Sequence, residues 1–229
     1  MSVDTPAVEL SGLRVSYGDL EVIRGVDLKV GDGEFLAVLG ANGAGKTTLL
    51  STVAGLLSPS AGNVSLWGEK TSSPAYRRAR TGLAFIGDDR QLFPSLTVAQ
   101  TMRLVRDQTE DPREIFPALE PLWSRSVGLL SGGEQQMVAL GRALAGNPRL
   151  IIVDELSQGL APVIRDRLLD RLRMAADNGT TVVVVEQAVD AVLRVADRAA
   201  VLRQGEIVGV GSATEWKARE QELVASYLN

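Results

Sequence analysis

The sequence predicts an α/β fold built on a mostly parallel sheet, and three observations support that prediction. Two short apolar runs rich in β-branched residues, Leu150–Val153 and Val182–Val185, are typical of strands buried on both faces of a parallel sheet. Between them lies a helical pattern that begins at Pro162 and stops at Asn178 and Gly179, which completes a β-α-β unit. The third observation is the order of strand, glycine-rich turn and helix over residues 35–57. The composition, 229 residues with 45% hydrophobic and 23% charged, suits a globular chain with a sizeable core.

The N-terminal part of the chain has a different pattern, which predicts antiparallel strands. Leu13, Val15 and Tyr17 alternate with polar residues, as the side chains of a half-buried strand do. A second run of this kind follows the turn at Gly18 and Asp19. We therefore expect an antiparallel β subdomain at the start of the fold.

The regular alternation of strands and helices is interrupted between residues 88 and 145. This stretch contains helical patterns and several prolines, but no convincing strand. We expect it to form a helical subdomain, inserted into the core of a single domain that spans residues 1–229.

The C-terminal residues predict a last helix. Ser212 and Glu215 have the spacing of a capping box, in which the two side chains satisfy the first N–H groups of a helix. Trp216, Leu223 and Tyr227 recur at helical spacing, so we expect them to face inward.

The residue types that the chain lacks exclude several kinds of chemistry. It has no cysteine and no histidine, which excludes disulfides, thiolate or imidazole metal sites and serine-histidine-aspartate triads. Any metal ion must therefore be bound by oxygen. With 24 basic and 28 acidic side chains, the net charge of −4 disfavours nucleic acid as a partner. The sequence shows neither a secretory signal nor a membrane-spanning stretch, so we expect a cytoplasmic protein.

A glycine-rich loop between a buried strand and an amphipathic helix is the strongest functional signal. Residues 40–47 match the pattern G-x-x-x-x-G-K-[ST], after the apolar run Phe35–Leu39 and at the start of a helical pattern over Lys46–Leu57. In this pattern backbone N–H groups cradle phosphates, the lysine adds a positive charge, and the hydroxyl of Thr47 is offered to Mg²⁺. The expected nucleotide-binding residues of the loop are Gly40, Ala41, Asn42, Gly43, Ala44, Gly45, Lys46, Thr47 and Thr48.

Two adjacent carboxylates follow the predicted strand Leu150–Val153. The carboxyl end of such a strand is where ligands bind in open α/β sheets. We expect Asp154 to orient Mg²⁺ and Glu155 to polarise a water molecule for attack on the γ-phosphate of a nucleotide. The alternative, an acidic turn that closes a strand, is less favoured beside a phosphate-binding loop.

A third segment, Leu130–Gln136, precedes a helical pattern that extends to about Ala145. Ser131, Gly132 and Gly133 offer a hydroxyl and backbone amides at a helix N-terminus, which can bind an anion without a lysine. Ser131 is also followed three residues later by a glutamate, so the segment taken alone is better explained as a helix cap.

In this order and spacing, the three segments resemble the Walker A, signature and Walker B motifs of the ATP-binding subunits of ABC transporters. The resemblance covers essentially the whole chain and is more specific in three places, Leu130–Met137, Gly159–Pro162 and Val185–Gln187, which resemble LivF-type subunits of branched-chain amino-acid importers. It implies a P-loop NTPase fold of ABC type, with a helical insertion in a RecA-like core. It also implies an ATPase that uses ATP and Mg²⁺ to drive transport, at the inner face of the cell membrane.

The resemblance implies partners as well. One is a second ATPase subunit, identical or related, in a head-to-tail dimer where Ser131, Gly132 and Gly133 close the ATP held by the other subunit. The others are the membrane subunits of the transporter, and the apolar edge of residues 93–98 resembles the part of the insertion that lies next to them. Ordinary packing within the insertion is an equal alternative for that edge. Tyr17 lies where the family has an aromatic residue that stacks on adenine, but it also continues the predicted strand.

Four features depart from the family pattern. Asp88 stands in place of a glutamine or glutamate, and we expect it to reach Mg²⁺ or the attacking water through a second water. Gln187 replaces the switch histidine, as in LivF-type chains, and can hydrogen-bond the γ-phosphate. Leu156 replaces a proline and residues 157–159 vary, which predicts a less rigid loop. Because the glycine-rich loop and both carboxylates are present, we expect ATP hydrolysis to be retained.

Two other classes of function are alternatives for a chain with these motifs. Soluble ABC ATPases of DNA repair insert long heptad segments, whereas only about 80 residues without heptads separate Thr47 from Leu130 here. A nucleotide-binding partner that has lost hydrolysis is suggested by Asp88 and Leu156, but both carboxylates survive. We expect no residue of this chain to contact the transported solute, so branched-chain amino acids are suggested by the resemblance alone.

Overall fold

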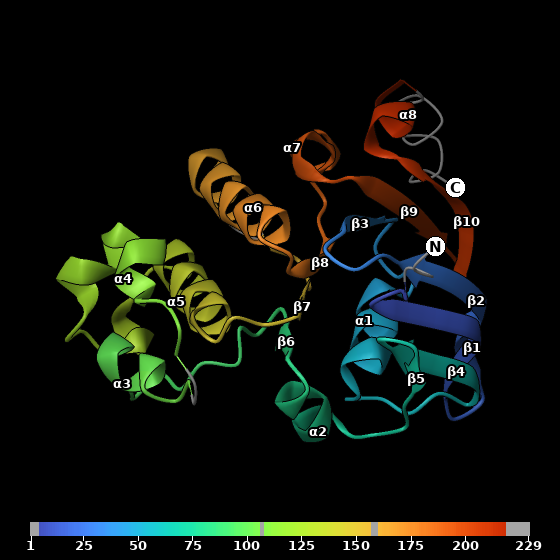
Figure 1. The fold of residues 1–229 in the computed structure, drawn as a ribbon, viewed down its shortest axis with the longest axis horizontal. Helices are drawn as coiled ribbons and strands as arrows, with labels where there is room; N and C mark the ends of the chain where they lie inside the picture. Colours follow the sequence, from blue (N-terminus) through green and yellow to red (C-terminus); the bar gives the residue numbers. More distant parts are fainter. Residues whose placement is uncertain (1–4, 106–107, 157–159, 219–229) are drawn as a thin grey trace.

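Two sheets and the helices around them make up the fold. The computed structural model describes residues 5–105, 108–156 and 160–218. One sheet is antiparallel, the other is mostly parallel, and helices pack against them (Figure 1). This architecture confirms the predicted fold class. None of the helices in these three ranges is long and apolar enough to span a bilayer.

The mostly parallel sheet has the strand order β10-β9-β3-β8-β7-β6, in which only β10 runs antiparallel to its neighbour. Every residue of β3, β7 and β8 is buried, as their continuous apolar runs predict. The strands are β3 (Phe35–Leu39), β6 (Leu83–Ile86), β7 (Leu150–Val153), β8 (Thr181–Val185), β9 (Arg198–Arg203) and β10 (Glu206–Ser212).

The antiparallel sheet has the order β2-β1-β4-β5 and begins with the predicted hairpin. Its strands are β1 (Val8–Tyr17), β2 (Leu20–Val30), β4 (Ala61–Leu66) and β5 (Glu69–Lys70). The last pair of the hairpin is Tyr17 with Leu20, so Gly18 and Asp19 form the turn. Tyr17 therefore stands at the tip of the hairpin.

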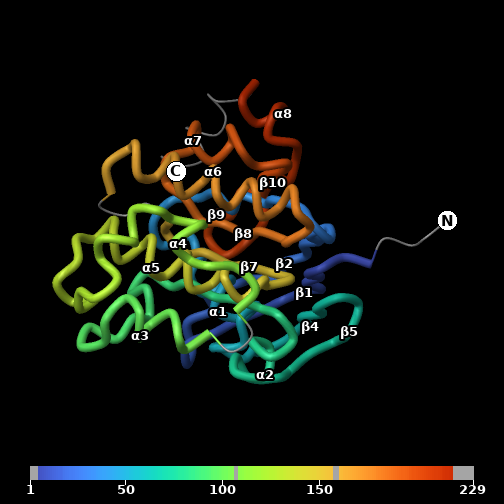
Figure 2. Tube along the Cα trace, turned by 60° about the vertical axis from the view of Figure 1, so that its left-hand side comes forward, coloured from blue at the N-terminus to red at the C-terminus, as the bar shows by residue number. Residues whose placement is uncertain are grey.

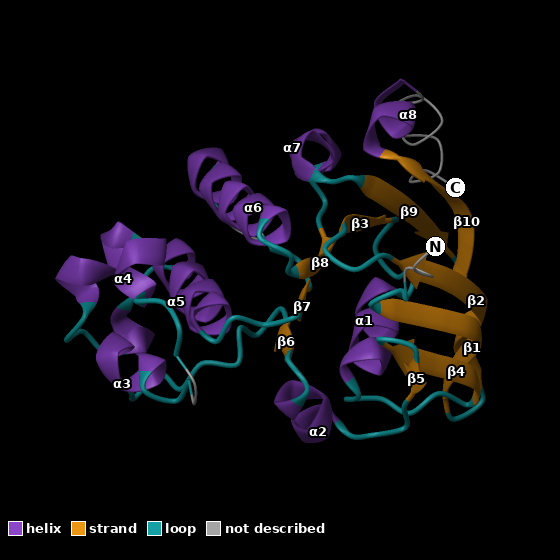
Figure 3. Ribbon diagram, viewed as in Figure 1, coloured by secondary structure: helices purple, strands orange, loops and turns teal. Residues whose placement is uncertain are grey.

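The helices surround the strands, and Figure 3 shows them in purple. Helix α1 lies against the antiparallel sheet, whereas α3, α4 and α5 lie together on the opposite side of the molecule (Figure 1). The helices are α1 (Lys46–Ala54), α2 (Ala75–Arg80), α3 (Val98–Met102), α4 (Pro112–Ile115), α5 (Gly132–Ala145), α6 (Pro162–Asp177), α7 (Val189–Val195) and α8 (Ala213–Ala218), with 3-10 turns η1 (Pro117–Leu122) and η2 (Val127–Leu129).

Between β6 and β7 the described residues form helices and turns but no strand, and they keep together when the molecule is turned (Figure 2). The boundaries 88–145 of an inserted subdomain stay a prediction.

The structure tests the predicted end of helix α1 and the predicted start of the last helix. Helix α1 ends at Ala54 rather than Leu57, because Gly55 adopts a left-handed conformation that caps it. At the C-terminus, the predicted capping box forms: Ser212 N–H donates to Glu215 and Glu215 N–H donates to the Ser212 hydroxyl. The Trp216 side chain packs inward and donates to the carbonyl of Ala199. Leu223 and Tyr227 lie outside the described residues.

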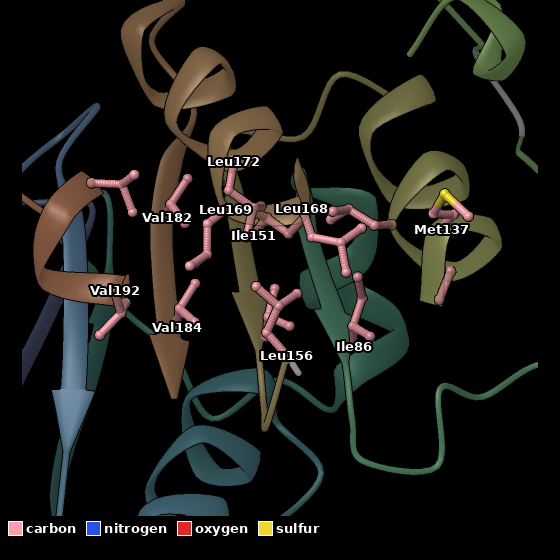
Figure 4. Packing of buried hydrophobic residues seen from close by; sticks show 14 of the residues in the cluster. Ile86, Met137, Ile151, Leu156, Leu168, Leu169, Leu172, Val182, Val184 and Val192 are labelled. Carbon is pink, nitrogen blue, oxygen red and sulfur yellow. The ribbon is translucent and has the colours of Figure 1, made fainter. Parts of the chain in front are cut away.

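Side chains along each central strand alternate between two hydrophobic clusters. In β3, Leu36 and Val38 join a cluster with α1 and the antiparallel sheet, whereas Ala37 and Leu39 face the opposite way. That second cluster is shared with α5, α6 and α7. Figure 4 shows three leucines of α6, at positions 168, 169 and 172, packed over the side chains of β7 and β8. The sheet is thus held on both faces, and its carboxyl edge carries the loops described next.

Candidate nucleotide-binding site

The glycine-rich loop (Gly40–Thr48) connects β3 to α1, and its glycines are required by its shape. Gly40 has φ 154°, and a Cβ atom there would collide with the carbonyl oxygen of Leu202 on β9. Gly45 has φ 103° and precedes α1 directly. No side chain caps α1, and its first turn has no acidic residue. This helix N-terminus is open to an anion.

Lys46 brings a buried positive charge to the loop. Its side chain is 6% exposed, and Nζ donates to the carbonyl oxygens of Gly40 at 2.8 Å and Ala41 at 2.9 Å. Burial lowers the pKa of Lys46, whereas the charges of Glu155 and Asp154 raise it. A pocket of about 300 Å³ opens here, lined by Val22, Asn42, Gly43, Gly45, Lys46, Thr47, Thr48 and Glu155. The structure therefore brings the predicted loop and the predicted water-activating carboxylate to one pocket.

Asp154 is a buried carboxylate whose two oxygens have no hydrogen-bond partner in the part of the chain that the structure describes. It is only 1% exposed. Burial raises the pKa of Asp154, and the Thr47 hydroxyl opposes that rise. The negative charges of Glu155 and Asp88 add to the rise, because both lie at the same edge of the sheet. A buried carboxylate without partners is costly, so a cation is the expected counterpart.

The donor set suits Mg²⁺. This ion is commonly held by one or two carboxylates together with phosphate oxygens and water, rather than by a complete protein cage. Asp154 and the hydroxyl of Thr47 supply such oxygens. Within the described ranges, no group of three or more acidic residues gathers that could hold an ion alone.

Glu155 and Gln187 are in contact. The Gln187 amide donates through Nε2 to Oε1 of Glu155 at 3.2 Å. Glu155 adopts φ 51°, a left-handed conformation that side chains other than glycine rarely adopt and that often occurs at functional sites. Two of the residues predicted to act in hydrolysis are thus brought together from two neighbouring strand ends.

Leu156, which stands where the family has a proline, is buried. The sequence predicts a less rigid loop where leucine replaces proline, but Leu156 is 1% exposed and belongs to the hydrophobic cluster shown in Figure 4. Its N–H also donates to the carbonyl of Val185 at 3.4 Å, a contact that proline cannot make. Leu156 itself is thus anchored by its side chain and its backbone, whereas the reduced rigidity of the loop as a whole stays a prediction. Residues 157–159 lie outside the described ranges.

Tyr17 stands beside the loop rather than in the core. Its side chain is 51% exposed, and its hydroxyl lies 3.5 Å from the hydroxyl of Thr48. The hairpin tip therefore presents an aromatic ring next to the start of α1. This position favours the ligand-stacking interpretation of Tyr17 over a core tyrosine.

Asp88 lies on the exposed loop after β6. One of its oxygens accepts the N–H of Asp89 at 2.8 Å, and no direct hydrogen bond to the loop residues is observed in the described ranges. Its charge nevertheless acts on Asp154, which lies at the end of the neighbouring strand. The two carboxylates are therefore near enough to share an electrostatic environment.

The segment around Ser131 forms the helix cap that its sequence suggests. Ser131 is the N-cap residue of α5; its hydroxyl donates to Oε2 of Glu134 at 2.8 Å, and its N–H donates to the same oxygen at 2.7 Å. Those hydrogen bonds lower the pKa of Glu134. Of the described residues that line the 300 Å³ pocket, none belongs to this segment. Within one chain, Ser131, Gly132 and Gly133 are not brought to the glycine-rich loop.

Comparison with known proteins identifies the family. The sequence profile of a family described as ABC transporter matches residues 23–158. The high-affinity branched-chain amino acid transport ATP-binding protein BraG of Pseudomonas aeruginosa is 35% identical, over 90% of this chain and 95% of BraG. The chain belongs to the ABC transporter family.

Other relatives of this ABC protein differ in the solutes their names give. A protein named probable branched-chain amino acid transport ATP-binding protein LivF, from Archaeoglobus fulgidus, is 32% identical over 91% of this chain and 93% of its own length. The Fe(3+) ions import ATP-binding protein FbpC of Streptomyces coelicolor is 38% identical over 96% of this chain, but over only 66% of its own length.

Solved structures agree on the ABC fold. A nucleotide-free ATP-binding cassette from an ABC transporter has a TM-score of 0.85 at 23% identity, covering 98% of this chain and 99% of the other. A dimeric bacterial ABC transporter cassette has a TM-score of 0.81 at 25% identity, covering 90% and 98%. The chain is an ABC ATPase, and its fold is that of the ATP-binding cassette.

Sequence reasoning missed a connection between the Asp88 loop and α5 of this cassette. Arg90 Nε donates to Oε1 of Gln136 at 2.8 Å, and Arg142 donates to the carbonyl of Gln91 at 3.2 Å. The partners are separated by 46 and 51 positions in the chain. No local motif marks such pairs, and the left-handed conformation of Arg90 and Gln91 is visible only in the structure.

Proposed function

We propose that this chain is the ATP-hydrolysing subunit that powers an ABC importer for branched-chain or related amino acids. Motifs in the signature segment and the match to BraG support the solute class. The BraG match extends over 95% of that protein, whereas the more identical iron relative is matched over 66% of its length. An end-to-end match to a relative named for amino-acid transport favours that solute over iron.

One observation carries the chemical part of the proposal: the buried carboxylate of Asp154 has no hydrogen-bond partner among the described residues, and its charge acts on Lys46 of the glycine-rich loop. ATP phosphates would be held by loop N–H groups and Lys46, with the Tyr17 ring against adenine. Thr47 and Asp154 would hold Mg²⁺, and Asp88 would reach it through water. When bound, that ion neutralises phosphate charge.

Glu155 and Gln187 would act on the water and the γ-phosphate. Glu155 accepts a hydrogen bond and lines the pocket, so its free oxygen lone pairs can orient a water and accept its proton. Gln187 holds Glu155 through a neutral amide, which keeps the carboxylate in place without titrating. The amide is also a donor that can be shared with a phosphate oxygen.

The site needs a second subunit. Ser131, Gly132 and Gly133 lie at an exposed helix N-terminus away from the pocket of their own chain. In a head-to-tail dimer they would face the ATP of the partner, and α5 would add its positive end to that of α1. ATP then acts as a ligand shared by two subunits and stabilises their association.

We further propose that membrane subunits of the transporter bind near Phe93 and hold the chain at the cytoplasmic face. Phe93 is 58% exposed and Leu129 is 66% exposed. A hydrogen bond of 2.9 Å from Gly128 N–H to the carbonyl of Pro94 joins the two segments that carry them. Crosslinks from position 93 should reach a membrane subunit; crosslinks that reach only the second ATPase subunit would contradict this assignment.

The experiment that tests the function compares the wild-type chain with Glu155→Gln in the assembled complex. We expect both to bind ATP, and Glu155→Gln to lower turnover by about 100-fold or more, since it removes the proton acceptor. Single-turnover assays with radiolabelled ATP measure this directly. Wild-type turnover no higher than that of Glu155→Gln would show that the chain binds nucleotide without hydrolysing it.

A further inference from the structure

Glu186 is a buried carboxylate that the chemistry proposed above does not use. It follows β8 directly and is only 3% exposed. Carboxylates are rarely buried to this extent unless they are paired or hydrogen-bonded, because burial removes their hydration. Its place in the fold is specific: β8 lies between β3, which leads into the glycine-rich loop, and β7, which leads into Asp154.

The Glu186 side chain holds the turn that follows it. Its Oε1 atom accepts the N–H of Gln187 at 2.8 Å and the N–H of Ala188 at 2.9 Å. Hydrogen bonds to an ionised acceptor are stronger than those between neutral groups. Ala188 is the N-cap residue of α7 and has no capping side chain of its own. Glu186 therefore fixes the backbone between the end of β8 and the start of α7.

That turn carries Gln187, whose amide reaches Glu155. The distance from Gln187 Nε2 to Oε1 of Glu155 is 3.2 Å, close to the limit of a useful hydrogen bond. A small change of the turn would break it. The Glu155 side of the contact is also held by β8, since Leu156 N–H donates to the carbonyl of Val185. Both members of the pair are thus fixed to the last residues of one strand.

We propose that Glu186 is a positioning residue for ATP hydrolysis, which holds Gln187 so that its amide keeps Glu155 in place. The inference rests on the proposed roles of Glu155 and Gln187. Glu186 is not among the described residues that line the 300 Å³ pocket, so it acts through Gln187 rather than on ATP. A merely structural role, in which Glu186 only stabilises the start of α7, predicts a loss of stability without a specific loss of turnover.

Steady-state ATP hydrolysis by the chain in its complex tests the proposal with four variants: Glu186→Ala, Glu186→Gln, Gln187→Ala and the double variant. Glu186→Ala should lower kcat by about 10- to 100-fold, the cost of a misplaced catalytic group, while KM for ATP changes less than about threefold. Glu186→Gln keeps an acceptor oxygen at Oε1 and should stay within about threefold of wild type. In Glu186→Ala with Gln187→Ala, kcat should equal that of Gln187→Ala alone within about twofold, because residues that act as a unit are not additive.

Glu34 provides a matched control. It also accepts a turn N–H, from Gly31 at 2.6 Å, and its side chain is largely buried, but it precedes β3 at the end of the sheet away from the loop. Glu34→Ala should lower the melting temperature without a specific effect on kcat. Thermal melts of all variants separate stability from turnover.

Several results would overturn the inference. Unchanged kcat in a folded Glu186→Ala protein would do so, and so would a double variant whose losses multiply. If Glu186→Ala does not fold, Glu186→Gln decides. A kcat of folded Glu186→Gln as low as that of Gln187→Ala would overturn the inference, because an acceptor oxygen at position 186 would then not be enough to hold Gln187. Failure of the proposed function is distinguishable, because wild-type turnover would then not exceed that of Glu155→Gln.

Discussion

Helices α1 and α5 both have glycines at their N-termini, but the two N-termini are capped differently. Helix α1 follows Gly45, has no capping side chain and carries a buried lysine at its first residue. Helix α5 is closed by the reciprocal hydrogen bonds of Ser131 and Glu134, with no lysine nearby in its first turn. An open N-terminus with a positive charge can bind phosphate alone. For the capped and exposed N-terminus of α5, we propose that it supplements a site that another subunit provides.

The largest effect should come from removing the charge that distinguishes α1. Lys46→Ala should weaken ATP binding by about 100-fold, since it removes a charged donor worth about 3 kcal/mol to a phosphate. Calorimetric titration with ATP measures this. Lys70→Ala, at an exposed lysine on β5, is the control and should bind ATP as the wild type does. Equal affinities for the two variants would mean that the open helix end does not hold the triphosphate.

A smaller effect should follow from changing the cap of α5. Ser131→Ala should leave ATP binding by the single chain unchanged but weaken ATP-dependent dimerisation by about tenfold, the loss of roughly one hydrogen bond. Light scattering in the Glu155→Gln background measures dimerisation.

Thr97→Ala is the matched control for Ser131→Ala. Thr97 forms the same reciprocal cap on α3 with Gln100. Both substitutions should cost about 1 kcal/mol of stability. Only Ser131→Ala should weaken dimerisation. An equal effect of Thr97→Ala on dimerisation would mean that Ser131 acts only as a structural helix cap.

The smallest effect concerns Glu134 and pH. Hydrogen bonds from Ser131 lower the pKa of Glu134 below its ordinary 4.5 in the folded chain. A carboxyl group with a lowered folded pKa stabilises the fold above its unfolded pKa, and this contribution is lost as pH falls through the folded value. Glu134→Gln should therefore be slightly less stable than wild type near pH 7, and the difference should shrink as pH falls below 4.5. Urea unfolding at pH 7 and pH 3.5 measures the two differences.

Local sequence patterns predicted the parts of the fold that depend on local chemistry. The glycine-rich loop, the strand that leads into Asp154 and the cap at Ser131 each consist of adjacent residues whose geometry is self-contained. The hairpin of β1 and β2 was predictable for the same reason, since alternation and a turn specify it.

Contacts between distant residues could not be predicted in this way. The burial of Leu156 could not be predicted from its neighbours in the sequence, because its side chain enters a core assembled from α6, β7 and β8. Arg90, on the loop after β6, bonds to Gln136 on α5, and Gln187 reaches Glu155 because β7 and β8 are neighbouring strands. The end of α1 was misjudged for a local reason, since Gly55 stops the helix where apolar spacing alone continues it.

The peptide group behind the glycine-rich loop limits how this chain can vary. The obstacle to any side chain at position 40 is the main-chain oxygen of Leu202, not the leucine side chain. A smaller residue at position 202 would therefore create no room, and no single exchange there can compensate for a replaced glycine. Gly43 is different: no described protein atom would contact a Cβ there, so its φ of 80° and its place in the lining of the nucleotide pocket are what oppose a side chain. Variants screened for folding should therefore tolerate a substitution at position 43 better than one at position 40, whereas a screen for ATP binding should tolerate neither.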